Sequence, residues 1–128
     1  MTAPICPYCG KPAVMATGDE VYSQRLDLDE KRFWCCWPCD ARVGCHPGTR
    51  NPLGTLANAP LRRLRNQVHA LFDPFWKRAR KQRGKERRAA YARLANDLGI
   101  PSSECHVAHF DADRCEKALI AILGWGRP

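Results

Sequence analysis

Four of the eight cysteines in this chain of 128 residues form two pairs with the same spacing. The pairs are Cys6-Pro7-Tyr8-Cys9 and Cys36-Trp37-Pro38-Cys39. In each pair, two thiolates separated by two residues can reach one metal ion from a tight turn. Four thiolates are the ligand set of a closed, tetrahedral structural zinc site, which has no open position for water or a substrate. The sequence therefore predicts one structural zinc ion held by Cys6, Cys9, Cys36 and Cys39.

Cys35 competes with its neighbour Cys36 for the third ligand position. Only Cys36 keeps the two-residue spacing to Cys39, so we expect Cys35 to point to the other face of its strand. The 26 residues between the pairs exceed the common spacing, which a long intervening arm would accommodate. The less favoured alternative to a zinc site is that these four cysteines are free, buried side chains.

Two Cys-His dipeptides, Cys45-His46 and Cys105-His106, are further candidates for chemistry. Brought together, they would form a second metal site or a thiol–imidazole pair for catalysis. In the structural alternative, the cysteines are small buried side chains and the histidines hydrogen-bond to the backbone. We favour this alternative, so we predict no catalytic residue and rank a second zinc ion below a single one.

Positive charge is concentrated in one part of the chain, whose net charge is +8. Residues 62–93 contain twelve Lys and Arg against two acidic residues, whereas the remainder contains nine basic and eleven acidic residues. This pattern favours a polyanionic partner, most often nucleic acid, over an anionic membrane surface or a merely solvated face. The residues predicted to contact nucleic acid are Arg62, Arg63, Arg65, Lys77, Arg78, Arg80, Lys81, Arg83, Lys85, Arg87 and Arg88, with Trp76, Trp37 and Tyr8 as candidates for stacking.

The expected compartment is a reducing cytoplasm. The N-terminal stretch before Cys6 has neither a basic start nor an apolar run, so we expect no signal peptide. The apolar run 118–123 is too short to span a bilayer. Zinc thiolates therefore fit the cysteines better than disulfides do, and we expect no membrane association.

The metal ligands require a turn-rich N-terminal segment, and residues 1–48 have this character. Short apolar pieces at 13–16, 32–35 and 41–44 predict strands beside the metal, and the polar stretch 18–30 predicts an extended arm or loop. Residues 49–60 are rich in Gly, Pro, Asn and Thr, which indicates a connector.

Residues 61–128 show the apolar period of helices. We expect one helix from Leu61, a restart at Asp73-Pro74 with an end near Gly84, another helix over 85–98 stopped by Gly99, and a last one from Asp111 or Asp113 to Gly124. The predicted fold is small and α+β: an N-terminal zinc ribbon of short antiparallel strands, followed by a basic region of three to four helices packed on it as one compact domain.

The order of motifs along the chain resembles a family of small zinc-finger-containing proteins of bacteriophages and prophages. The motifs are Cys-Pro-x-Cys-Gly at the start, then Val43-Gly44-Cys45-His46-Pro47-Gly48-Thr49, His69-Ala70-Leu71-Phe72-Asp73-Pro74-Phe75-Trp76, Cys105-His106 and Cys115. The resemblance implies that Cys6, Cys9, Cys36 and Cys39 form the zinc finger, and it implies no activity. Cys35 and His109 depart from the family's pattern.

We therefore expect a zinc-binding phage or prophage accessory protein of the bacterial cytoplasm. Its basic helical face would bind nucleic acid, either DNA or RNA, or a nucleoprotein complex. The alternative is a protein-interaction module that inhibits a host machine such as a polymerase, nuclease or defence complex. An enzyme that uses the Cys-His pairs is the third hypothesis.

Overall fold

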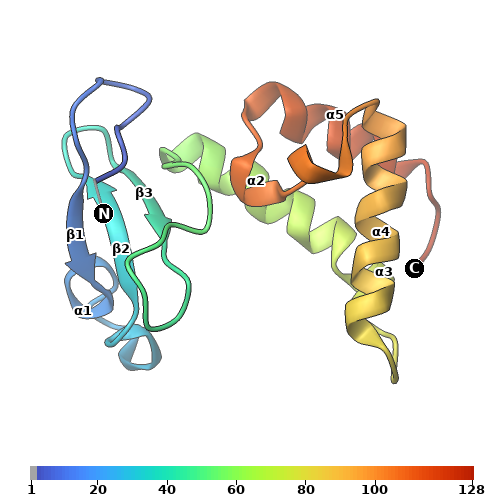
Figure 1. Cartoon of the computed structure of the whole chain (residues 1–128), viewed down its shortest axis with the longest axis horizontal. Coiled ribbons are helices and arrows are strands. Elements are labelled where there is room, and N and C mark those ends of the chain that lie inside the picture. Colours follow the sequence, from blue (N-terminus) through green and yellow to red (C-terminus); the bar gives the residue numbers. More distant parts are fainter. Residues whose placement is uncertain (1–2) are drawn as a thin grey trace. The chain divides into compact units, whose positions relative to one another are not determined.

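The computed structural model describes residues 3–128 (Figure 1). Met1 and Thr2 lie outside the described residues. They are part of the N-terminal stretch that we expect not to be a signal peptide. The chain divides into two compact units, Met1–Pro60 and Leu61–Pro128. The first unit contains a β-sheet and the second consists of helices, which confirms the predicted α+β class.

The sheet of the first unit is a three-stranded antiparallel meander in the order β1-β2-β3. It consists of β1 (Val14–Thr17), β2 (Arg32–Cys36) and β3 (Ala41–Gly44), which confirms the three predicted strands. Cys36 is the last residue of β2 and lies opposite Ala41. Because side chains alternate along a strand, Trp34 and Cys36 share one face and pack with Val43 in the core of the unit.

The segment after β3 turns back along this strand. Arg42 and Ala57 exchange two backbone hydrogen bonds of 3.0 and 3.1 Å, and the Leu53 N–H donates to the Gly44 carbonyl at 2.8 Å. Leu56 is buried in the same core as Trp34. The residues of the predicted connector therefore complete the first unit.

Residues 18–30 were predicted as an extended arm or a loop, and the structure shows a loop with two short helical turns. They contain a single helical turn, α1 (Gly18–Val21), and a 3-10 turn, Leu26–Leu28. Thr17 and Glu20 form a capping box at the start of α1. The sequence contains this motif, but the stretch has no helical apolar period, so no helix was predicted there. Gly18 itself is buried against the 3-10 turn.

Replacing Gly18 with Ala should destabilise the first unit by about 2–3 kcal/mol, because the new Cβ would overlap the Leu28 carbonyl and force the backbone apart. Gly84→Ala is the matched control. Gly84 is exposed within a helix, so its replacement should stabilise the second unit by about 0.5–1 kcal/mol. Chemical denaturation of the zinc-loaded variants measures both changes, and equal effects of the same sign would contradict the close packing of Gly18.

The second unit is built from four helices: α2 (Ala59–Phe72), α3 (Pro74–Lys77), α4 (Arg83–Leu98) and α5 (Ala112–Leu123) (Figure 1). Short 3-10 turns, Ser102–Glu104 and Val107–His109, connect α4 to α5. The core of this unit is continuous and contains Val68, Phe72, Leu94, Phe110 and Ile122. The second unit therefore has an apolar core of its own.

The helix boundaries follow their local signals with one exception. The break at Asp73-Pro74 is confirmed, Gly99 ends α4 with a φ of +68°, and the Asp111 side chain caps α5 by accepting from the Arg114 N–H at 2.8 Å. The predicted helix end near Gly84 is wrong. The α3 helix stops at Lys77, and Gln82, with a φ of +57°, precedes α4.

None of the helices in residues 3–128 has both the length and the apolar character that spanning a membrane requires.

Candidate functional site

The first pair of metal ligands comes from a tight turn at the N-terminus. The Cys6 N–H donates to the Lys11 carbonyl and the Gly10 N–H donates to the Cys6 carbonyl, both at 2.9 Å. Gly10 has a φ of +76°, which a residue without a Cβ adopts at little cost. These bonds fold the backbone so that Cys6 and Cys9 face the same point.

The second pair comes from the turn that joins β2 to β3. Cys36 ends β2, and the Asp40 N–H after Cys39 donates to the Trp37 carbonyl at 3.1 Å. Asp40 has a φ of +50°, so the residue after the second cysteine is left-handed in both turns. The two turns thus share a backbone feature, supplied once by glycine and once by aspartate, a residue that tolerates this conformation.

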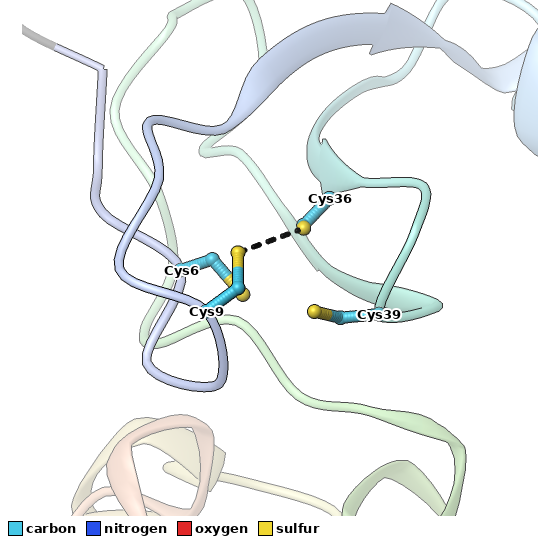
Figure 2. A group of neighbouring side chains, drawn as sticks. All are labelled: Cys6, Cys9, Cys36 and Cys39. Atoms are coloured by element: carbon cyan, nitrogen blue, oxygen red, sulfur yellow. Dashed lines mark hydrogen bonds between the residues drawn. The ribbon is translucent and has the colours of Figure 1, made fainter.

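The four sulfurs of Cys6, Cys9, Cys36 and Cys39 point toward one another in Figure 2 and lie within 4.8 Å of one another. The Sγ atoms of Cys9 and Cys36 are 3.6 Å apart. A tetrahedron with Zn–S bonds of about 2.3 Å has sulfur–sulfur edges of about 3.8 Å. The cluster therefore has the size and the donor set of a single zinc site.

The four clustered thiols also affect one another's protonation when no cation is bound. A hydrogen bond with the Cys36 sulfur is the largest of the effects that raise the pKa of the Cys39 thiol, to about 12. Such thiols lose their protons when a divalent ion binds. Four thiolates would then complete the coordination of zinc, so the ion would stabilise the fold and hold no reactive water.

Cys35 lies outside the cluster, as its predicted orientation requires. It pairs with Val14 and Arg42 in the sheet register and is buried on the face opposite Cys36. The strand period therefore distinguishes the two adjacent cysteines.

The two Cys-His pairs belong to different units. Cys45 is buried in the first unit beside a pocket of about 240 Å³ that His46, Lys31 and Arg32 also line. Cys105 is buried in the core of the second unit, whereas His106 is exposed. Within residues 3–128, the four-cysteine cluster is the only group of three or more Cys, His, Asp or Glu side chains placed to hold an ion. A site that combines the two pairs stays a prediction.

The buried thiols are poorly suited to nucleophilic catalysis. Burial raises the pKa of Cys105 and of Cys115 to about 11, and it also raises the pKa of Cys45. Since the thiolate is the nucleophile, these environments suppress reactivity and support the structural role that we expect for these residues.

Alkylation of the native, zinc-loaded protein at pH 8 should therefore leave Cys105 and Cys115 unmodified. A pKa of about 11 in place of 9.0 lowers the thiolate fraction at this pH roughly 100-fold, and burial slows the reaction further. Peptide mass spectrometry after timed alkylation, with the unfolded protein as the reference, measures the protection. Rapid labelling of Cys105 would revive the hypothesis of a thiol enzyme.

The predicted nucleic-acid contacts on α2 need one correction. The Arg65 side chain does not face solvent: the residue is only 8% exposed, and its Nε and Nη2 atoms donate to the Phe110 carbonyl at 3.0 and 2.9 Å. Arg65 thus satisfies a buried carbonyl and is withdrawn from the predicted contact set. Arg63 is exposed and Arg62 is half-buried.

The predicted cations from Lys77 to Arg88 lie on α3, on the bend after it and at the start of α4. We call them the basic surface. All of its members are exposed. Among the described residues, only Lys77 has a carboxylate partner, Asp73 at 3.6 Å. The basic surface consists of Lys77, Arg78, Arg80, Lys81, Arg83, Lys85, Arg87 and Arg88.

Sequence reasoning missed a set of planar contacts within this surface. The Arg87 guanidinium lies over the rings of both Trp76 and Tyr91. The four-residue spacing of Arg87 and Tyr91 on a helix is a signal for one of these contacts. Trp76 comes from another helix, and no sequence spacing reveals it.

A four-thiolate centre formed by two Cys-x-x-Cys turns beside a small antiparallel sheet defines a zinc finger of the ribbon type. Comparison with protein families gives the same class, because residues 2–123 match the model of a family described as a zinc-finger-containing domain. The chain belongs to this family. Searches of curated proteins and of solved structures give no match.

Proposed function

We propose that this chain is a phage or prophage accessory protein of the bacterial cytoplasm that binds nucleic acid through the basic surface, while a zinc ion holds the first unit. The observation that carries the proposal is the set of eight exposed cations within residues 77–88, which contain one acidic residue, Glu86. The phage origin rests on the resemblance of the motifs.

The division of charge between the units supports this assignment. The first unit contains six Lys and Arg and six Asp and Glu, and is neutral. The second contains fifteen Lys and Arg against seven Asp and Glu, a net charge of +8. The entire net charge of the chain therefore lies in the unit that carries the basic surface.

The mechanism is electrostatic attraction with release of counterions. Neighbouring cations without carboxylate partners repel one another, and a phosphate backbone relieves this repulsion while it releases its condensed ions. Arginine predominates in the surface and can contact phosphate oxygens in a bidentate manner. Such contacts position a nucleic acid without reading its sequence.

Fluorescence anisotropy with labelled DNA and RNA oligonucleotides at 50 and 200 mM salt tests the proposal. We expect binding at low salt that weakens steeply, by about 10³-fold if six phosphates are neutralised. Absence of binding to either nucleic acid at 50 mM salt would refute the proposal.

The first unit supports a second candidate function, docking to a protein of the host, such as a component of a polymerase, nuclease or defence complex. Ile5, Tyr8 and Trp37 on the two cysteine turns are 55%, 43% and 51% exposed, and aromatic residues on a neutral surface are typical of protein interfaces. Affinity capture from nuclease-treated host lysate distinguishes the candidates. A stoichiometric protein that persists favours docking, and partners lost with the nucleic acid favour the first function.

A further inference from the structure

Arg87 occupies an unusual position within the basic surface, because it lies over two aromatic rings. Its guanidinium carbon lies 5.6 Å from the centroid of the Trp76 ring and 4.9 Å from that of the Tyr91 ring. The side chain is exposed, and no carboxylate among residues 3–128 pairs with it. A planar cation is thus held by rings while its charge stays open to solvent.

The two rings are held by the fold. Tyr91 packs against the buried Phe72 with a centroid separation of 4.6 Å, and Trp76 belongs to the same apolar core. The Trp76 Nε1 atom is buried and has no hydrogen-bond partner in the described part of the chain. A buried donor without an acceptor is costly, and the flexible Lys77 and Arg87 side chains lie over this ring.

The ring contacts continue beyond Tyr91, with the rings inclined to one another by 52° and 63°. The ring centroids of Tyr91 and His106 are 5.8 Å apart, and those of His106 and His109 are 6.3 Å apart. Both histidines are exposed. We call this series of neighbouring planar groups the stacking row: Trp76, Arg87, Tyr91, His106 and His109.

We propose that the stacking row binds unpaired bases, so that the nucleic acid recognised by this chain is single-stranded. The inference rests on the proposed function and specifies its ligand. Bases in a duplex stack on one another and present only their edges, whereas an unpaired base can stack on an aromatic ring or a guanidinium plane. The surrounding cations would follow the phosphates while the row takes up the bases.

A purely structural role for Arg87 would be to join α3 to α4. That role needs only a cation over the two rings and makes no distinction between nucleic acids. The stacking role requires the planar guanidinium and the exposed imidazoles, and it affects single strands alone. The two roles therefore predict different outcomes for a substitution that keeps the charge.

The experiment compares the wild type with Arg87→Lys, which keeps the positive charge and loses the plane. Arg93→Lys is the matched control, because Arg93 lies on the same helix, stacks on Trp125 at 4.2 Å, and is outside the basic surface. Anisotropy at constant salt measures the affinity for a single-stranded oligonucleotide and for the duplex of the same sequence. Thermal unfolding checks that the variants are folded.

We expect the wild type to prefer the single strand. Arg87→Lys should weaken single-strand binding by about 10-fold, the order expected for one stacked base, with little effect on the duplex or on the salt dependence. Arg93→Lys should bind like the wild type. His106→Ala, a change at an exposed side chain, should weaken single-strand binding severalfold and provides a second measurement should Arg87→Lys fold poorly.

Equal affinities of the wild type for single strand and duplex, or equal effects of Arg87→Lys on both, would overturn the inference and leave the proposed function intact. Absence of any binding at low salt would instead refute the proposed function.

Discussion

Replacing Cys36 with Ala should abolish zinc binding and unfold the first unit, while the second unit keeps its helices. Structural zinc contributes about 10–16 kcal/mol in small zinc-finger peptides, more than the roughly 3–5 kcal/mol that the core of so small a unit supplies. The second unit has its own apolar core around Phe72 and Phe110. Zinc analysis, with near- and far-UV circular dichroism, measures the loss of metal, the loss of tertiary structure and the retention of helix.

The adjacent Cys35→Ala variant is the control for this experiment. Cys35 is buried on the opposite face of β2 and is not a member of the four-cysteine cluster. Its replacement should keep one zinc ion per chain and cost only about 1 kcal/mol of stability, since a small buried side chain is shortened. If Cys35→Ala lost zinc and Cys36→Ala kept it, the third ligand would be Cys35 and the assignment to Cys36 would be wrong.

Neutralising three residues of the basic surface should weaken nucleic-acid binding more than any other substitution considered above. The triple variant Arg78→Gln, Arg80→Gln and Lys81→Gln removes three exposed cations that form no ion pair with a carboxylate of the described residues. If each contacts one phosphate, the slope of log K against log salt should fall by about 2–3. The affinity near physiological salt should fall on the order of 10- to 100-fold. Anisotropy titrations at four salt concentrations measure both quantities.

A second triple variant, Lys11→Gln, Arg25→Gln and Lys31→Gln, separates a local surface from net charge. All three residues are exposed cations of the neutral first unit. Both triple variants lower the net charge of the chain from +8 to +5. We expect the control variant to bind nearly as well as the wild type, and similar losses in the two variants would show that net charge, not the basic surface, drives binding.

Arg65 shows why a count of charges does not define a binding surface. It belongs to the same basic stretch of sequence as Arg63, yet its guanidinium satisfies the buried Phe110 carbonyl. A helix presents one side to the core, and an arginine on that side can turn its donors to the backbone of a distant segment. The composition of a segment predicts its charge, whereas packing determines which charges a partner can reach.

The sequence by itself determined the features that depend on short spacings. Two residues between cysteines bring two sulfurs to one point, so the spacing to Cys39 assigns Cys36 to the cluster, and the strand period then places Cys35 on the other face. Proline after Asp73 and glycine at position 99 interrupt the helices where they do because each restricts or extends the local backbone. These effects act within a few residues and need no knowledge of the rest of the fold.

Only the tertiary structure decided the features that join distant segments. The return of residues 49–60 along β3, the contact of Gly18 with Leu28 and the contact of Arg87 with Trp76 each depend on packing between elements. No local period or spacing encodes such contacts, because the partner residue can lie anywhere in the chain. The zinc ligands were therefore predictable from spacing, whereas the stacking row and the burial of Arg65 were not.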